Sequence, residues 1–184
     1  MPLDPTIFSP DAVTRWDSLI VAAAARHGIP AALLRAIVAQ ESAGNPNAWR
    51  DEPTISAPQY GIYGDASYGL VQILLSTARD MGFKGRIAEL LDPAVNLDLG
   101  AKYLAHLAGR FGGSVQDTIS AYNQGGPYKD GTGAYRNQRY VDSVLRRITS
   151  APAGGGGAKP RGGLLAAAVI GGAVLWLSTR RGRK

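Results

Sequence analysis

Apolar residues recur at helical spacing along most of the first 149 residues. The pattern between residues 11 and 27, for example, places Trp16, Leu19 and Ile20 on one face. Several such stretches begin or end at Ser, Asp, Pro or Gly, the residues that commonly cap helices. The pattern predicts helices over residues 11–27, 30–43, about 68–81, 92–107, 114–122 and 138–148.

No alternating run is long enough to predict a strand firmly. The stretch from residue 49 to 66 is rich in Pro, Gly and Tyr, and both a short hairpin and an irregular loop remain open for it. The fold class predicted for residues 1–149 is therefore mainly α.

A different composition follows this region. Residues 150–162 contain Pro152, four consecutive glycines and Pro160, which is typical of a flexible linker. Residues 163–179 form an uncharged apolar run, long enough at ~1.5 Å per residue to cross a bilayer as one helix. The sequence thus predicts a single C-terminal transmembrane helix, with a basic tail at 180–184. A buried core helix and an amphipathic surface helix are the alternatives.

The net charge of +6 comes from the end of the chain. Six of the 20 basic residues lie beyond the Gly run, and the remaining 14 match the 14 acidic residues. The folded region is close to neutral, so we expect no nucleic acid to bind the globular domain. Cysteine is absent, which excludes disulfides and thiolate chemistry.

Three polar signatures interrupt the helical pattern. The first is Gln40-Glu41-Ser42-Ala43-Gly44-Asn45-Pro46, where an apolar helix ends. The second is Ser67-Tyr68-Gly69-Leu70-Val71-Gln72, and the third is Ala121-Tyr122-Asn123-Gln124-Gly125. A glutamate at the end of an apolar helix can be half buried, which raises its pKa and suits it to protonate a leaving oxygen.

Together these signatures resemble the goose-type-lysozyme-like lytic transglycosylases, and the resemblance covers roughly residues 15–148. It implies a lysozyme-like helical domain with an active-site cleft. The implied reaction cleaves the β-1,4 bond between N-acetylmuramic acid and N-acetylglucosamine in peptidoglycan and leaves a 1,6-anhydro end. Glu41 takes the place of the catalytic glutamate, first as acid and then as base. The alternative for Glu41 is an ordinary solvated glutamate.

The resemblance also implies a set of residues around the substrate. Ser42 and Asn45 would orient the turn that carries the acid, although Ser42 could equally be a simple helix-end hydroxyl. Tyr122 would wall the cleft and Asn123 would hydrogen-bond the N-acetyl group. The full set of substrate-binding residues comprises Ser42, Asn45, Ser67, Gly69, Gln72, Tyr122, Asn123 and Tyr140.

Tyr140 matches a tyrosine that hydrogen-bonds the catalytic glutamate in the family, and a core or surface tyrosine is the alternative. Two positions depart from the family pattern. Val71 replaces the usual methionine, and Gln124 stands where alanine is frequent.

A hydrolytic lysozyme is the alternative enzyme, because the long connection between the first two signatures carries further acids. Asp51, Glu52 or Asp65 could act as the second carboxylate that an inverting hydrolase needs. A non-enzymatic, membrane-anchored module that only binds glycan is the third possibility.

No secretory signal is visible at the start of the chain, so we expect delivery in a bacteriophage particle that opens the wall for genome entry. The alternative is an envelope machine at the bacterial inner membrane, with the enzyme facing the periplasm. Expected partners are peptidoglycan strands, a lipid membrane through residues 163–179, and other virion or envelope proteins. His27 and His106 show no metal-ligand spacing, and neither metal nor cofactor is implied.

Overall fold

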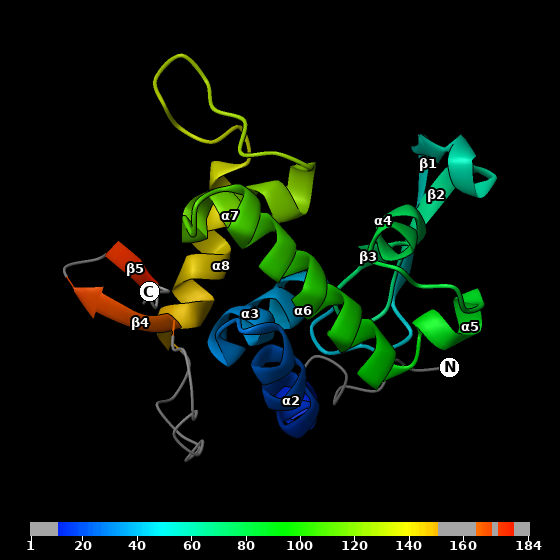
Figure 1. Cartoon of the computed structure of the whole chain (residues 1–184), viewed down its shortest axis with the longest axis horizontal. Helices are drawn as coiled ribbons and strands as arrows, with labels where there is room; N and C mark the ends of the chain where they lie inside the picture. Colours follow the sequence, from blue (N-terminus) through cyan, green and yellow to red (C-terminus); the bar gives the residue numbers. More distant parts are fainter. Residues whose placement is uncertain (1–10, 151–164, 171–172, 179–184) are drawn as a thin grey trace, which may run out of the picture.

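The computed structural model describes residues 11–150, 165–170 and 173–178. Helices dominate the region up to residue 150, as the sequence predicts (Figure 1). They are α1 (Asp11–Thr14), α2 (Asp17–His27), α3 (Ala31–Glu41), α4 (Leu75–Asp80), α5 (Ile87–Leu90), α6 (Pro93–Arg110), α7 (Val115–Gln124) and α8 (Gln138–Ser150).

Helix α6 runs through the middle of this body. It begins sharply because Pro93 occupies its first turn and the Asp92 carboxylate accepts hydrogen bonds from the Ala94 and Val95 amides. It packs against α2 and α7, while α3 packs against α8. The largest fully buried side chains of the core are Ile20, Leu34, Ile37, Leu70, Leu90, Leu97, Leu104, Leu107 and Ile119.

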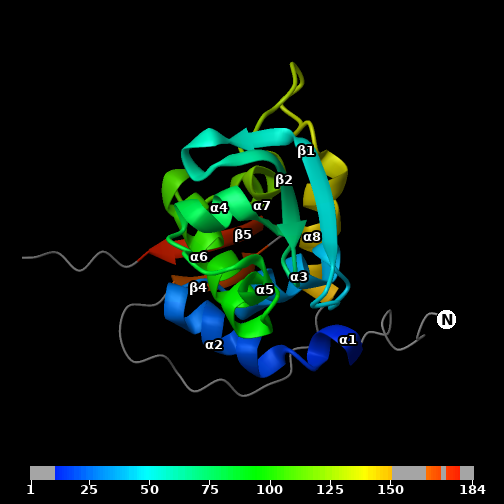
Figure 2. The same ribbon diagram turned by 90° about the vertical axis from the view of Figure 1, so that its right-hand side faces the viewer.

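An antiparallel hairpin projects from the helical body in Figure 1 and faces the viewer in Figure 2. Strand β1 (Trp49–Ala57) pairs with β2 (Ile62–Tyr68), and a short 3-10 turn, η2 (Pro58–Tyr60), joins them. A third, two-residue strand, β3 (Ile73–Leu74), pairs with the end of β2. Of the two possibilities that the sequence left open for residues 49–66, the hairpin is therefore the one that forms.

The helix predicted from about residue 68 begins only at Leu75, so that part of the prediction is wrong. Between β2 and β3 the chain turns back on itself, with φ of +74° at Gly69 and +47° at Gln72. Such left-handed backbone cannot continue a helix. The Asp65 carboxylate then accepts hydrogen bonds from the Leu75 and Ser76 amides and starts α4 instead. Likewise, the single helix expected over residues 11–27 is divided into α1 and α2.

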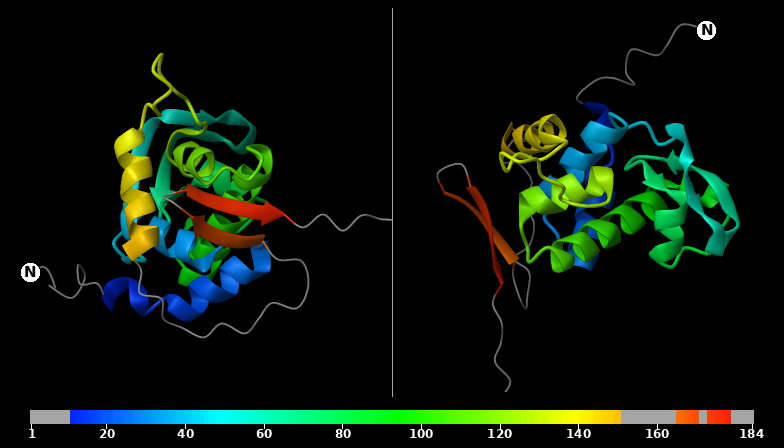
Figure 3. Two further views of the ribbon diagram at one scale, coloured as in Figure 1. Left: turned by 90° about the vertical axis from the view of Figure 1, so that its left-hand side faces the viewer. Right: turned by 90° about the horizontal axis from the view of Figure 1, so that it is seen from above.

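The transmembrane helix expected over residues 163–179 is also wrong for the part of that range that the structure describes. Residues 165–170 and 173–178 form strands β4 (Leu165–Ile170) and β5 (Ala173–Ser178), which pair antiparallel (Figure 3). No helix in the described part of the chain is apolar and long enough to cross a membrane.

Gly171 and Gly172 divide this run into two short apolar stretches, and a stretch of that length fits a strand or a helix by pattern alone. The β-branched residues Val169, Ile170 and Val174 beside a Gly-Gly pair favour a hairpin. The predicted linker beyond residue 150 and the basic tail at 180–184 lie outside the described residues.

Candidate active site

Glu41 is the last residue of α3, a helix whose inner face is buried through Leu34, Ile37 and Val38. The helix ends here because Ala43 and Gly44 adopt left-handed backbone, with φ of +51° and +83°. A side chain at position 44 would lie 2.4 Å from the carbonyl oxygen of Ala12, so only glycine fits. Packing of the first helices against this turn therefore fixes where the acid lies.

Glu41 is half-buried, and its carboxyl group lies against α8. Its Oε1 accepts a short hydrogen bond from the phenol of Tyr140, which lies on α8 and 99 positions further along the chain. Burial raises the pKa of Glu41, whereas the Tyr140 hydrogen bond and the positive charge of Arg50 lower it. Burial is the largest of these effects, so the pKa of Glu41 is raised overall and the protonated acid is favoured.

Two tyrosines surround this acid. Burial and the charge of Glu41 raise the pKa of both Tyr122 and Tyr140, so both phenols remain neutral donors. The Tyr122 hydroxyl donates to the carbonyl of Val71 at 2.7 Å, and its ring lies 5.4 Å from that of Tyr103, centroid to centroid. The structure thus places Tyr122 and Tyr140 beside Glu41.

The second signature forms the turn between β2 and β3, and its polar side chains bind the protein itself. The Gln72 amide donates to the carbonyls of Ala48 and Gly69, both at 3.0 Å, and accepts from the Ser67 hydroxyl at 3.2 Å. Ser67 is buried. Gln72 and Ser67 therefore hold the turn in place, a positioning role that the sequence did not indicate.

The first signature is tied to this turn through Ser42. Its hydroxyl donates to the Leu70 carbonyl at 2.8 Å and accepts from the Gly44 amide at 3.2 Å. Ser42 thus orients the turn that carries the acid. Asn45 follows in the same turn, where its side-chain oxygen accepts from the Asn47 amide at 3.0 Å.

One residue of this assembly, Asn96 on α6, was missed by the sequence reasoning. Its fully buried amide donates to the carbonyls of Tyr68 and Leu90 and accepts from the Val71 amide at 3.0 Å. Gly69 lies so close that a Cβ there would come within 2.4 Å of the Asn96 nitrogen. The available signal was a polar residue beside Val95 and Leu97, within the apolar stripe of a helix.

A pocket of about 310 Å³ lies beside Tyr122. Glu41 is not part of its lining, but it is near enough for its charge to raise the pKa of Tyr122. The lining comprises Ile55, Gln72, Ile73, Leu74, Thr77, Tyr103, Tyr122, Asn123, Gln124 and Gly125. Residues of the second and third signatures thus share one pocket next to the acid, with the β1 strand supplying Ile55.

The three acidic residues that could serve as the second carboxylate of a hydrolase make contacts away from the pocket beside Tyr122. Asp65 is buried and accepts from the amides of Ala66, Leu75 and Ser76. Glu52 forms an ion pair with Arg50 at 2.5 Å. Asp51 lines a separate pocket of about 440 Å³, together with Tyr63 and Tyr68.

Two curated proteins resemble this chain in sequence. Membrane-bound lytic murein transglycosylase E of Buchnera aphidicola is 32% identical over 126 residues, which cover 65% of this chain and 51% of that protein. Endo-type membrane-bound lytic murein transglycosylase A of Salmonella paratyphi B is 32% identical over 128 residues, which cover 65% and 57%. The chain therefore spans about half the length of these curated relatives.

A solved structure shares the fold. An inactive mutant of the lytic transglycosylase Slt from Pseudomonas aeruginosa aligns with a TM-score of 0.56 at 24% identity, over 71% of this chain and 23% of that one. The family profile described as "Transglycosylase SLT domain" matches residues 18–141, which include Glu41, the β2–β3 turn and the third signature. This chain belongs to the SLT transglycosylase domain family.

Proposed function

We propose that this chain is a peptidoglycan lytic transglycosylase with Glu41 as its catalytic carboxylate. The observation that carries the proposal is the burial of Glu41 against Tyr140, beside a pocket lined by Gln72, Tyr122 and Asn123. The names of the curated relatives, lytic murein transglycosylases E and A, support peptidoglycan as the substrate.

The reaction needs one group that gives a proton and later takes one. Protonated Glu41 donates its proton to the glycosidic oxygen as the bond from that oxygen to the anomeric carbon breaks. The carboxylate that remains then removes the proton from the sugar's own 6-hydroxyl. That oxygen attacks the anomeric carbon and closes the 1,6-anhydro ring. Glu41 ends protonated, as it began, and no water is consumed.

Tyr140 fits both halves of this cycle. Burial keeps the proton on Glu41 before the first step, whereas the Tyr140 hydroxyl stabilises the carboxylate that forms during it. The phenol itself does not ionise, because burial and the neighbouring charge raise its pKa. We therefore assign Tyr140 a role in stabilising the ionised acid between the two steps.

Hydrolysis, as in a lysozyme, is the second candidate reaction. The contacts of the acidic residues in the hairpin argue against it. The Asp65 oxygens already accept three backbone amides, and Glu52 is paired with Arg50. Asp51 lines a different pocket from the one beside Tyr122. A transglycosylase needs no second carboxylate, since the sugar supplies the nucleophile.

The products of digestion distinguish the two reactions. The full chain is incubated with purified sacculi, and the released muropeptides are analysed by mass spectrometry, with Glu41→Gln as the comparison. We expect 1,6-anhydro ends, each one water lighter than the hydrolysed product, and almost no release by the variant. Reducing ends would show a lysozyme instead. Equal release by both proteins would remove Glu41 from the mechanism, and no release by either would leave a glycan-binding module.

The cellular location of the enzyme is a second and more specific part of the proposal. The relatives are described as membrane-bound, which supports a place at the bacterial envelope. Local wall opening for genome entry from a bacteriophage particle stays a prediction from the sequence. Mass spectrometry of purified particles tests it, and absence of the protein from them would contradict it.

A further inference from the structure

A second pocket, of about 440 Å³, lies where β1 and β2 meet the first residues of α4 and α5, and we call it the hairpin pocket. These elements lie on the opposite side of the molecule from α8 (Figure 1). The hairpin pocket shares no lining residue with the pocket beside Tyr122, although the consecutive residues Leu74 and Leu75 line one pocket each. The two pockets are therefore separate sites with a common wall.

The hairpin pocket carries negative charge without any positive charge. Its lining includes Asp51 and Asp65, and none of its lining residues is basic. Both carboxylates act on the phenol of Tyr68, which lies in the same lining. Burial raises the pKa of Tyr68, and the charges of Asp65 and Asp51 raise it further. A pocket of this kind repels anions and attracts cations.

The two carboxylates differ in their partners. Asp65 is buried, and its oxygens accept hydrogen bonds from three backbone amides. Asp51 is exposed, and its carboxylate has no hydrogen-bond or ion-pair partner among the described residues. The neighbouring Glu52 is paired with Arg50 instead. The charge of Asp51 is therefore available to a ligand in the hairpin pocket.

The rest of the lining suits an organic cation better than a metal ion. Tyr63 lines the pocket while 80% exposed, and Tyr68 supplies a second aromatic ring, so both can contact an ammonium group. Three aliphatic side chains complete the lining on its apolar side: Ile62, Leu75 and Ile87. In the part of the chain that the structure describes, no group of three His, Asp or Glu side chains could hold a metal ion.

We propose that the hairpin pocket binds a primary ammonium group carried on an aliphatic chain. The ammonium pairs with the Asp51 carboxylate and contacts the rings of Tyr63 and Tyr68, while the chain packs against the apolar side of the lining. Two sources carry this chemistry, the free amine of a wall peptide that has not been cross-linked and an aliphatic amine in solution. The site goes beyond the proposed function, because it neither involves Glu41 nor requires glycan cleavage.

Binding of a lysine derivative tests the proposal. The probe is Nα-acetyl-lysine methylamide, and the comparison compound carries a further acetyl group on its Nε atom, which removes the charge. Each compound is titrated into the full chain, and the backbone amide signals of Ala66 and Tyr68 are followed by NMR. We expect the charged compound to bind about fivefold more tightly, as an exposed ion pair with a cation–π contact gives. Equal binding, or no change in these signals, would overturn the proposal.

Asp51→Asn keeps the shape of the side chain and removes its charge. We expect the preference of about fivefold for the charged compound to disappear. Because Asp51 is exposed, the substitution leaves the core intact. Asp142→Asn makes the same change on α8, outside the lining, and should keep the preference. A preference that survives in Asp51→Asn would contradict the assignment of the site.

Tyr63 allows an independent test of the aromatic contact. Tyr63→Leu removes the ring and should weaken binding of the charged compound about threefold. Tyr63→Phe keeps the ring face and should bind that compound as the unmodified protein does. Equal affinities of the two variants would show that the ring of Tyr63 takes no part in binding.

Retention on sacculi distinguishes the two sources of the amine. The full chain carrying Glu41→Gln is sedimented with sacculi, with and without Asp51→Asn, before and after acetylation of the sacculus amines. Weaker retention after acetylation, and after Asp51→Asn, would identify the wall peptide as the source. Unchanged retention, together with binding of the lysine derivative, would identify an amine in solution. Both results support the site, and only failure of the lysine derivative to bind removes it.

Discussion

At the scale of single residues, Glu41 is held between opposing influences on its pKa. Burial favours the protonated acid, while Tyr140 and Arg50 favour the carboxylate. An acid that must release a proton and later recover it needs both kinds of effect on its pKa. Either kind alone would favour only the protonated or only the ionised form. The short hydrogen bond from Tyr140 is thus part of the chemistry as well as of the packing between α3 and α8.

Tyr140→Phe should therefore change the pH dependence of the reaction. The Tyr140 hydrogen bond lowers the pKa of Glu41, so its loss raises that pKa further. Activity requires the protonated acid and is lost as pH rises through the pKa of Glu41. The alkaline limb of the kcat/KM profile should move to higher pH, with kcat reduced about tenfold or more by loss of a hydrogen bond to a charged group.

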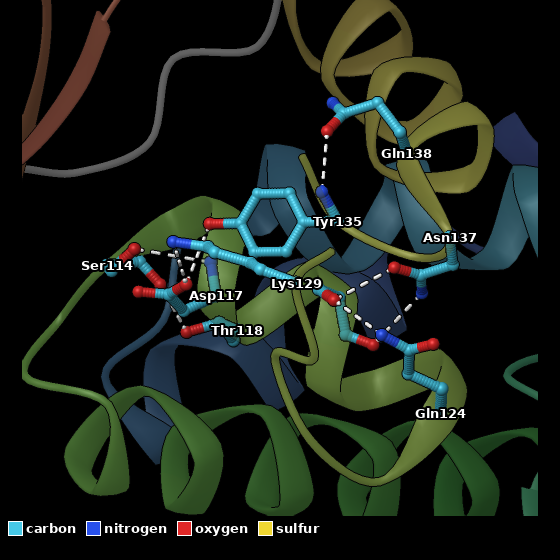
Figure 4. Close-up of polar contacts among 9 residues, drawn as sticks. Ser114, Asp117, Thr118, Gln124, Lys129, Tyr135, Asn137 and Gln138 are labelled. Atoms are coloured by element: carbon cyan, nitrogen blue, oxygen red, sulfur yellow. Dashed lines mark hydrogen bonds and ion pairs between the residues drawn. The ribbon is translucent and has the colours of Figure 1, made fainter. Parts of the chain in front are cut away.

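Tyr135→Phe is the matched control for that experiment. It also removes a phenol that donates to a carboxylate, that of Asp117 at 2.7 Å, but outside the Glu41 cluster (Figure 4). Its alkaline limb should coincide with that of the unmodified protein. A limb that stays in place or moves to lower pH in Tyr140→Phe would show that the phenol does not stabilise the ionised acid.

At the scale of elements, the turn between β2 and β3 joins the acid to the pocket. Ser42 and Gln72 connect the turn to the chain that follows Glu41. The Tyr122 hydroxyl donates to the Val71 carbonyl of the turn, and the buried Asn96 amide accepts from the Val71 amide. The turn thus contacts several parts of the site, and a displacement of it should affect them all.

Gly69→Ala tests this arrangement. The substitution places a Cβ 2.4 Å from the Asn96 nitrogen at a residue with φ of +74°, so Asn96 must move and its hydrogen bonds weaken. We expect urea denaturation to show a loss of about 2 to 4 kcal/mol, together with loss of glycan cleavage. Gly61→Ala has a similar φ of +69° but open space around it, and should cost only about 1 kcal/mol. Equal losses would show that contact with Asn96 is unimportant.

Sequence pattern predicted the helical elements well because each buries one continuous stripe, as in α3 and α6. It failed at the β2–β3 turn, since the apolar residues Leu70 and Ile73 fit a helical stripe and the left-handed backbone at Gln72 leaves no mark in the pattern. The β4–β5 segment was misassigned for a related reason, because an apolar run has the same pattern in a helix and in a buried strand.

The same limit applied within the site. Glu41, Tyr122 and Tyr140 could be named from their motifs, and the structure brings them together. The positioning roles of Gln72 and Asn96 could not be predicted from motifs. Each depends on backbone carbonyls from distant parts of the chain, which come near only in the folded structure.

At the scale of the whole molecule, the fold half-buries the Glu41 carboxyl group and leaves a pocket beside it. The end of α3 supplies the acid and α8 supplies its phenol partner, while β1, β3, α4, α6 and α7 contribute to the lining of the pocket (Figure 1). Residues 12–144 contain every member of the buried apolar core that the structure describes, so this region determines the environment of Glu41.

Carbon-13 NMR titration of the Glu41 side-chain carboxyl, assigned by comparison with Glu41→Gln, measures that environment directly. Since burial outweighs the hydrogen bond and the nearby charge, we predict a midpoint above the ordinary value of 4.5. A midpoint at or below 4.5 would mean that Glu41 is already ionised at neutral pH to the usual extent, and it could not then act as the acid of the proposed reaction.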